Sequence, residues 1–132
     1  MLPQKGNNMS QEDTCKILYI DDDENNSRLM KRILEAEGYQ VSLALNGLAG
    51  LSQANQERPD LVLLDLFMPD INGHEVARRL RDMETTRTVP IVMVSASSNP
   101  RDKLLSIQAG CDGYITKPIN VDCISSQLAS FL

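Results

Sequence analysis

The 132-residue chain has few aromatic residues and no tryptophan, which leaves its core to aliphatic side chains. Aromatic residues make up 4% of the sequence, whereas hydrophobic residues make up 42%. No apolar run approaches the ~20 residues of a membrane-spanning helix, so we predict no membrane insertion. The polar N-terminus also lacks the apolar segment of a signal peptide. We predict a flexible tail over residues 1–14 and one domain over residues 15–132.

Cysteine and clustered positive charge are also scarce. The three cysteines, Cys15, Cys111 and Cys123, show no motif spacing, which argues against a disulfide framework. A reducing cytoplasm is the simpler interpretation. The formal net charge is −5, and three arginines on one predicted helix form the longest cationic cluster. Binding a phosphate backbone requires several convergent cations, so we predict no direct nucleic-acid binding.

Short apolar runs alternate with helical patterns along the chain. The predicted strands are Lys16–Ile20, Tyr39–Leu45, Leu61–Leu64, Ile91–Val94 and Gly113–Ile115. The predicted helices are Asn26–Glu37, Leu48–Glu57, Gly73–Met83, a helix from Asn99 to Gly110, and Val121–Phe131. This alternation predicts an α/β fold of five βα units, with a doubly wound parallel sheet covered on both faces.

Local features of the helices are predicted as well. Leu29 has core spacing together with Ile33 and Leu34 in the first helix. Gly38 is expected to end that helix in a left-handed conformation. Asn120 is expected to cap the last helix.

Polar residues follow four of the predicted strands. Asp21 and Asp22 follow the first strand, Asp65 the third, Ser95 the fourth, and Lys117 lies just beyond the fifth. Sites in open α/β sheets form at the carboxyl ends of the strands, so these residues are expected to converge. Clustered carboxylates repel one another, and Mg²⁺ is a natural partner for them because it accepts carboxylates, waters and a phosphate oxygen.

Such a site is suited to phosphoryl transfer. A carboxylate at the end of a buried strand, here Asp65, can attack phosphorus and form an acyl phosphate. The three equatorial oxygens of the transferring group each need a partner. Mg²⁺, the Lys117 ammonium and the Ser95 hydroxyl together supply them.

The chain resembles the receiver domain of two-component response regulators, which has the CheY-like variant of the flavodoxin fold. The resemblance runs from about Lys16 to Leu132. The motifs that carry it, in order, are Ile20-Asp21-Asp22-Asp23, the run DLFMPDING at 65–73, Val94-Ser95-Ala96, and the run GYITKPI at 113–119.

The resemblance implies a metal site. Asp65 would be the phosphoacceptor and, with Asp22 and the backbone carbonyl of Phe67, a direct Mg²⁺ ligand. Asp21 would act on the ion through water. Phe67 stands where the family often has a polar side chain that helps to position the hydrolytic water. We hypothesise that Phe67 shields the phosphoryl group and slows its loss.

The resemblance also implies a switch. Ser95 and Lys117 would bind phosphoryl oxygens, and Tyr114 would move inward when Ser95 is drawn toward the phosphate. The Lys117-Pro118 bond is expected to be cis. The implied partners are a histidine kinase or histidine phosphotransfer protein as donor, and a downstream protein target or output domain. The domain would catalyse only its own phosphorylation and dephosphorylation, and phosphorylation-dependent homodimerisation stays open.

Other functions fit the sequence less well. A haloacid-dehalogenase-type phosphatase would use Asp21 as nucleophile, but Asn25 stands where that motif has Thr or Val. A flavodoxin-like flavin carrier needs a phosphate-binding loop after the first strand, where this chain has four acids. The single histidine, His74, has no second His or Cys motif beside it and is expected to be an exposed bystander.

Overall fold

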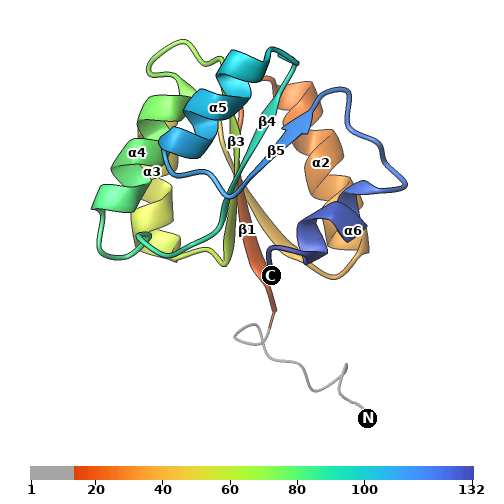
Figure 1. Cartoon of the computed structure of the whole chain (residues 1–132). Coiled ribbons are helices and arrows are strands. Elements are labelled where there is room, and N and C mark those ends of the chain that lie inside the picture. The colour runs from red at the N-terminus through yellow and green to blue at the C-terminus, as the bar shows by residue number, and fades with distance from the viewer. Residues whose placement is uncertain (1–13) are drawn as a thin grey trace.

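Five parallel strands form one sheet in the computed structural model, which describes residues 14–132 (Figure 1). The predicted α/β fold class is therefore confirmed. The predicted flexible tail over residues 1–14 lies outside the described residues apart from Thr14. Within residues 14–132, none of the helices has the length and apolar character needed to cross a bilayer.

Strands and helices alternate along the whole described chain. The strands are β1 Lys16–Ile20, β2 Gln40–Ala44, β3 Leu61–Asp65, β4 Ile91–Ser95 and β5 Gly113–Thr116. The helices are α2 Glu24–Ala36, α3 Gly47–Glu57, α4 Gly73–Asp82, α5 Pro100–Gln108 and α6 Ile124–Ala129.

The strand order is β2-β1-β3-β4-β5, so the chain reverses its direction of travel across the sheet at β1. β1 and β3 are neighbours, and Ile20 pairs with Leu64 at their ends. The next residues along the two strands are Asp21 and Asp65, which therefore emerge side by side. This is the switch point at which ligands bind in open α/β sheets.

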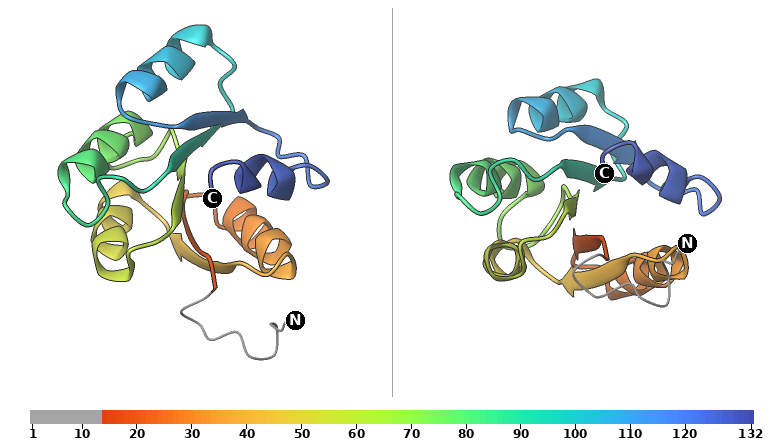
Figure 2. Two further views of the ribbon diagram at one scale, coloured as in Figure 1. Left: turned by 60° about the horizontal axis from the view of Figure 1, so that its bottom comes forward. Right: turned by 90° about the horizontal axis from the view of Figure 1, so that it is seen from below.

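Helices cover both faces of the sheet (Figure 2), and the three central strands β1, β3 and β4 are almost fully buried. α3, α4 and α5 cover one face, and α2 and α6 cover the other. Successive strand residues point to opposite faces, so Leu18 and Ile20 pack toward α3 and α4 while Ile17 and Tyr19 pack toward α2 and α6. Both core clusters consist mainly of aliphatic residues, as the scarcity of aromatics predicted.

α2 differs from its prediction in its start and in one core residue. It begins at Glu24 rather than at Asn26, because the Asp23 side chain accepts hydrogen bonds from the first backbone N–H groups. Leu29 is 50% exposed, so the prediction that it lies in the core was wrong. The buried stripe runs through Ser27, Met30 and Leu34, and Leu29 lies to one side of it.

The end of the first helix matches its prediction, whereas the bounds of the last helix do not. Gly38 has a φ of 98°, which confirms the left-handed residue predicted after the first helix. The predicted last helix, Val121–Phe131, is shorter and spans Ile124–Ala129. Asn120 does not cap it, because the Asn120 side chain accepts a hydrogen bond from Asp122 N and closes a turn before the helix.

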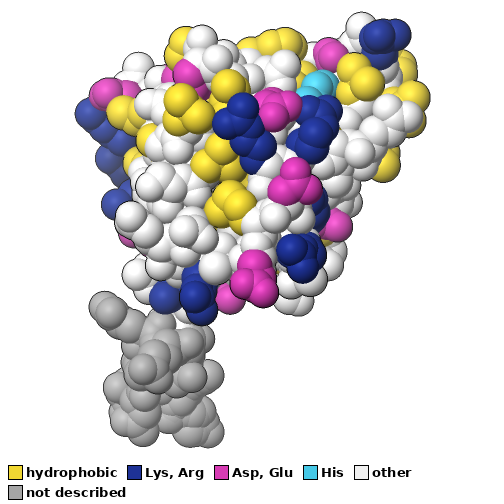
Figure 3. All heavy atoms as spheres, turned by 90° about the vertical axis from the view of Figure 1, so that its left-hand side faces the viewer, with side chains coloured by type: hydrophobic (Ala, Val, Ile, Leu, Met, Phe, Trp, Pro, Cys, Tyr) yellow, Lys and Arg dark blue, Asp and Glu magenta, His cyan; other side chains and the backbone are white. Residues whose placement is uncertain are grey.

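Both signs of charge are interspersed on the face that carries α3 and α4 (Figure 3). Glu75 pairs with Arg78 and Arg79 on α4, and Arg81 pairs with Asp112. The longest cationic cluster in the sequence is thus neutralised by neighbouring carboxylates rather than forming a basic face.

Candidate functional site

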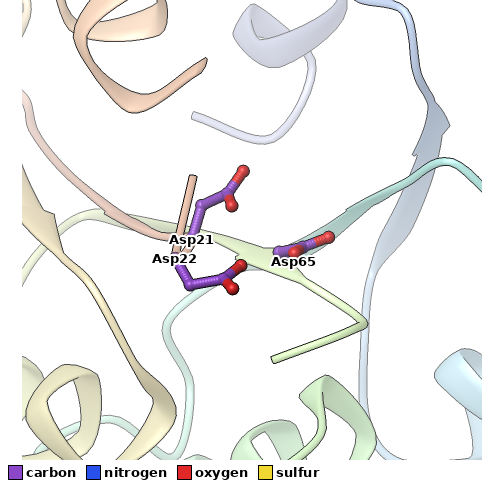
Figure 4. A group of neighbouring side chains, drawn as sticks. All are labelled: Asp21, Asp22 and Asp65. Carbon is purple, nitrogen blue, oxygen red and sulfur yellow. The ribbon is translucent and has the colours of Figure 1, made fainter. Parts of the chain in front are cut away.

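Three carboxylates meet at the ends of β1 and β3 (Figure 4). One oxygen from each of Asp21, Asp22 and Asp65 lies within 4.8 Å of the others. Asp21 is fully buried and Asp65 is 6% exposed, whereas Asp22 faces solvent. An oxygen-rich cluster with one open side is the donor set that hard divalent cations prefer.

Lys117 brings the ammonium group to this cluster from the loop after β5. Its Nζ lies 3.0 Å from Asp21 Oδ2 and 3.5 Å from Asp65 Oδ1. Burial alone would lower the pKa of Lys117, but the hydrogen bond and charge of Asp21, followed by the charge of Asp65, raise it. The Lys117-Pro118 bond is cis, as predicted.

Asp65 is the acid whose ionisation is most opposed by its surroundings. Burial raises its pKa to about 6, and the negative charge of Asp21 adds to this effect. Lys117 acts in the opposite direction but offsets only part of it. A bound cation would favour the charged carboxylate, so the site is electrostatically suited to a metal.

Asp21 is held by donors on both of its oxygens. Asp21 Oδ2 accepts hydrogen bonds from the Tyr19 hydroxyl at 2.6 Å and from Lys117 Nζ at 3.0 Å. Asp21 Oδ1 accepts one from Asp23 N at 2.9 Å. Burial, followed by the hydrogen bond to Asp21, raises the pKa of Tyr19 strongly, so its hydroxyl stays protonated as a donor.

Sequence reasoning assigned Tyr19 only to a buried strand and missed its contact with Asp21. The signal was present, because residues two apart on a strand share a face and Tyr19 precedes Asp21 by two. The sequence could not indicate that the Tyr19 ring packs in the core in an orientation that brings its hydroxyl to the Asp21 carboxylate.

Ser95 and Tyr114 are both joined to Ser97, which sequence reasoning also missed. Ser95 ends β4 and is fully buried, and its Oγ accepts a hydrogen bond from Ser97 N at 3.1 Å. The Tyr114 hydroxyl donates to Ser97 O at 2.7 Å. Ser97 Oγ donates to Asp102 on α5, so this loop connects the strand end to a helix.

The loop that carries Phe67 is fixed where it enters α4. Gly73 N donates to Leu66 O at 2.8 Å, closing the loop on itself. A Cβ atom at Gly73 would lie 2.6 Å from Asp65 O, so this close approach requires glycine. The side chain of Phe67 is 56% exposed on this loop.

The same loop is also attached to α3. Asp70 accepts hydrogen bonds from Gly47 N at 3.0 Å and from Leu48 N at 2.8 Å. Slight burial would raise the pKa of Asp70, but the hydrogen bonds from Leu48 and Gly47 outweigh it and lower the pKa. The backbone around Phe67 is therefore held at two points, which favours a fixed carbonyl position.

His74 is not the exposed bystander that the sequence predicted. Its Nε2 lies 3.0 Å from Ser106 Oγ and 3.3 Å from Asp102 O, both on α5. Ser106 Oγ donates to Asp102 O, which leaves it free to accept from the His74 ring. The side chain is half-buried and links α4 to α5, a contact between helices that the sequence pattern did not reveal.

A groove of about 380 Å³ opens beside Lys117. It is lined by Asn26, Leu29, Ala96, Lys117, Pro118 and Ile119. The exposed Leu29 therefore faces the site side of the molecule rather than the core.

Comparisons with known proteins agree with this geometry. The sequence model of the response regulator receiver domain matches residues 17–129. The polar-differentiation response regulator DivK of Brucella anthropi is 35% identical over 116 residues, which cover 88% of this chain and 94% of DivK. The response regulator PleD of Caulobacter vibrioides is 39% identical over 107 residues, 81% of this chain, and the match spans about a quarter (24%) of PleD.

Solved structures share the fold over nearly its whole length. The chemotaxis protein CheY4 of Vibrio cholerae has a TM-score of 0.87 at 27% identity, covering 90% of this chain and 99% of CheY4. The receiver domain of a sensor histidine kinase from Pseudomonas aeruginosa PAO1 has a TM-score of 0.83 at 28% identity, covering 89% and 97%. That structure holds a magnesium ion coordinated in its active-site cleft.

Proposed function

The chain belongs to the response regulator receiver domain family, and from this premise we propose that Asp65 accepts the phosphoryl group that switches it. The observation that carries the proposal is the cluster of Asp21, Asp22 and Asp65 with the Lys117 ammonium among them. Asp65 is the carboxylate at the end of a buried strand, where a phosphorus atom can be approached from the open edge.

Mg²⁺ is the proposed cofactor, with Asp22, Asp65 and the Phe67 backbone carbonyl as direct ligands and Asp21 acting through water. The fit is supported by the carboxylate oxygens within 4.8 Å and by the raised pKa of Asp65. When bound, the ion would neutralise charge on the transferring phosphoryl group. Asp21 fits the indirect role because three donors already occupy its oxygens.

Lys117 and Ser95 are the proposed partners of the remaining phosphoryl oxygens. Lys117 Nζ already lies 3.5 Å from Asp65 Oδ1. Ser95 ends β4, the strand that pairs with β3, and its hydroxyl would donate to a phosphoryl oxygen. Movement of Ser95 toward that oxygen would weaken the bond that its Oγ accepts from Ser97 N. The Tyr114 hydroxyl donates a hydrogen bond to Ser97 O. Movement of the loop that contains Ser97 would therefore displace the Tyr114 side chain. This is a two-state element biased by a local charge.

The proposed donor is a histidine kinase or histidine phosphotransfer protein, and the proposed recipient of the signal is a downstream protein or output domain. We assign the receiver to residues 15–132 and place it in the cytoplasm. Its chemistry would be limited to its own phosphorylation and dephosphorylation. The haloacid-dehalogenase alternative is not supported, because the family match is to receivers and Asp21 is buried among hydrogen-bond donors.

Labelling with acetyl phosphate in the presence of Mg²⁺ tests the proposal. Asp65→Asn should abolish the label, because the amide is not a nucleophile. Asp21→Asn serves as the comparison and should keep a label on Asp65, at a reduced rate. Loss of label only in Asp21→Asn would instead identify Asp21 as the nucleophile.

A further inference from the structure

Two hydrogen-bond donors share one oxygen of Asp21. The Tyr19 hydroxyl lies 2.6 Å from Asp21 Oδ2, and Lys117 Nζ lies 3.0 Å from the same atom. Lys117 also faces Asp65, whereas the only side-chain hydrogen bond of Tyr19 among the described residues is to Asp21. One donor is therefore shared between two carboxylates, and the other is dedicated to Asp21.

The two donors also differ in how firmly they are held. Tyr19 is 1% exposed, packs with the core between the sheet and helices α2 and α6, and pairs with Leu43 and Leu63 on the neighbouring strands. Lys117 lies on the loop after β5 and is partly exposed, at the end of a long flexible side chain. If one donor leaves Asp21, it is Lys117.

Asp21 cannot easily lose a partner without a replacement. Its side chain is fully buried away from bulk solvent, and Asp23 N already occupies Oδ1. A buried carboxylate stripped of donors is strongly disfavoured. Transfer of Lys117 to a phosphoryl oxygen would therefore be opposed unless another donor stayed on Oδ2.

We propose that Tyr19 is a positioning residue that holds Asp21 Oδ2 so that Lys117 can move to the phosphoryl group on Asp65. The inference rests on the proposed function, because it concerns the same site in its phosphorylated state. Tyr19 does not touch the reacting atoms and acts through Asp21. Its hydroxyl should stabilise the phosphorylated state more than the unphosphorylated state.

Tyr19→Phe tests this, because it removes the hydroxyl and keeps the ring. Beryllofluoride with Mg²⁺ mimics the acyl phosphate, and its affinity can be measured by calorimetry beside that of Mg²⁺ alone. We expect beryllofluoride to bind Tyr19→Phe about tenfold more weakly than wild type, the size of one hydrogen bond to a charged group. The affinity for Mg²⁺ alone should change by less than about twofold, since Lys117 stays on Asp21 in that state.

Tyr39→Phe is the matched control. Tyr39 packs against the same core cluster, but its hydroxyl makes no hydrogen bond among the described residues. This variant should leave both affinities unchanged. A purely structural role for Tyr19 would lower the melting temperature and leave the ratio of the two affinities at its wild-type value.

Several results would overturn the inference. Unchanged beryllofluoride affinity in Tyr19→Phe would show that Lys117 moves without this support. An equal loss of affinity for Mg²⁺ alone and for beryllofluoride would assign Tyr19 to the metal site instead. Failure of the wild-type protein to bind beryllofluoride would contradict the proposed function itself, which separates the two ideas.

A measurement on the wild-type protein covers the case in which Tyr19→Phe does not fold. The Tyr19 hydroxyl proton should be protected from exchange and visible by NMR in ring-labelled protein. On addition of Mg²⁺ and beryllofluoride it should persist and shift downfield, because it becomes the sole side-chain donor to Oδ2. Its loss by rapid exchange would refute the proposal.

Discussion

Asp65 combines two properties that conflict in a simple carboxylate, since it is buried beside other acids and yet, in the proposed reaction, would act as a charged nucleophile. Its pKa is about 6 because burial and Asp21 both disfavour its charge. Lys117 reduces the conflict, and a metal would reduce it further.

The pH dependence of stability follows from this pKa. The folded-state pKa of Asp65 lies above its value of 3.8 in an unfolded chain, so its stabilising contribution is present below about pH 4 and is lost as the pH rises through about 6. Metal-free wild type and Asp65→Asn should have similar stability at about pH 4, since the amide resembles the protonated acid. At about pH 7 the variant should be more stable by about 3 kcal/mol, because the pKa rises from 3.8 to about 6 and one pKa unit corresponds to about 1.4 kcal/mol.

Urea unfolding of both proteins in the presence of a chelator measures the difference. Adding Mg²⁺ should reduce it by stabilising the wild type alone, as the ion binds the charged carboxylate. A difference that did not vary with pH would mean that Asp65 titrates as an ordinary surface acid.

Phe67 gives a second prediction at this scale. Its exposed ring lies two residues beyond Asp65, on a loop fixed by Asp70. Phe67→Asn should shorten the half-life of the phosphorylated protein several-fold, because a polar side chain there can position water. Leu48→Asn, an equally exposed apolar residue on α3, should have no effect. An unchanged half-life in Phe67→Asn would rule out shielding by the ring.

At the scale of elements, Arg81 at the end of α4 connects three segments. Its guanidinium donates to Gly110 O after α5, and to Val89 O and Arg87 O before β4. It also pairs with the carboxylate of Asp112 at 2.8 Å. One side chain thus satisfies carbonyl groups in the loop before β4 and in the loop before β5.

Arg81→Ala should lower the free energy of unfolding by about 2–4 kcal/mol, because it leaves several part-buried carbonyls without a donor and removes the cation that pairs with Asp112. Arg79→Ala on the same helix is the control and should change it little, since the one side-chain ion pair of Arg79 among the described residues is with Glu75 at the surface. Chemical denaturation of the two variants distinguishes them. Equal effects would mean that the Arg81 contacts add nothing beyond a surface ion pair.

At the scale of the whole molecule, the switch is expected to link the sheet edge to α5. The Tyr114 hydroxyl binds Ser97 O, Ser97 Oγ binds Asp102 on α5, and His74 bridges α4 to the same helix. A change at Ser95 therefore has a continuous set of hydrogen bonds by which to reach an outer helix.

Mg²⁺ with beryllofluoride should accordingly change how the whole protein associates. We expect sedimentation or partner-binding measurements to show a change in mass or in partner affinity, and Asp65→Asn to show none. A rise in mass would indicate a phosphorylation-dependent homodimer, and a rise in affinity alone would indicate a heterologous target. No change in either would undercut the switch.

The sequence by itself determined the fold class and the clustering of the acids. Strand–helix alternation predicts a parallel sheet, in which the carboxyl ends of the strands lie at one edge, and the pairing of Ile20 with Leu64 confirms that Asp21 and Asp65 lie together there. Local chemistry also determined the left-handed Gly38. These features depend on periodicity and on backbone conformation, which are local.

Only the tertiary structure decided the contacts between elements. Tyr19 reaches Asp21, Ser97 joins Ser95 to Tyr114, and His74 reaches α5 because helices and loops pack at particular angles that no local pattern specifies. The exposure of Leu29 has the same origin, because the rotation of α2 about its own axis, as it packs on the sheet, determines which of its apolar residues are buried. The acids of the site follow from the order of residues along the strands, whereas the donors that position them follow from packing.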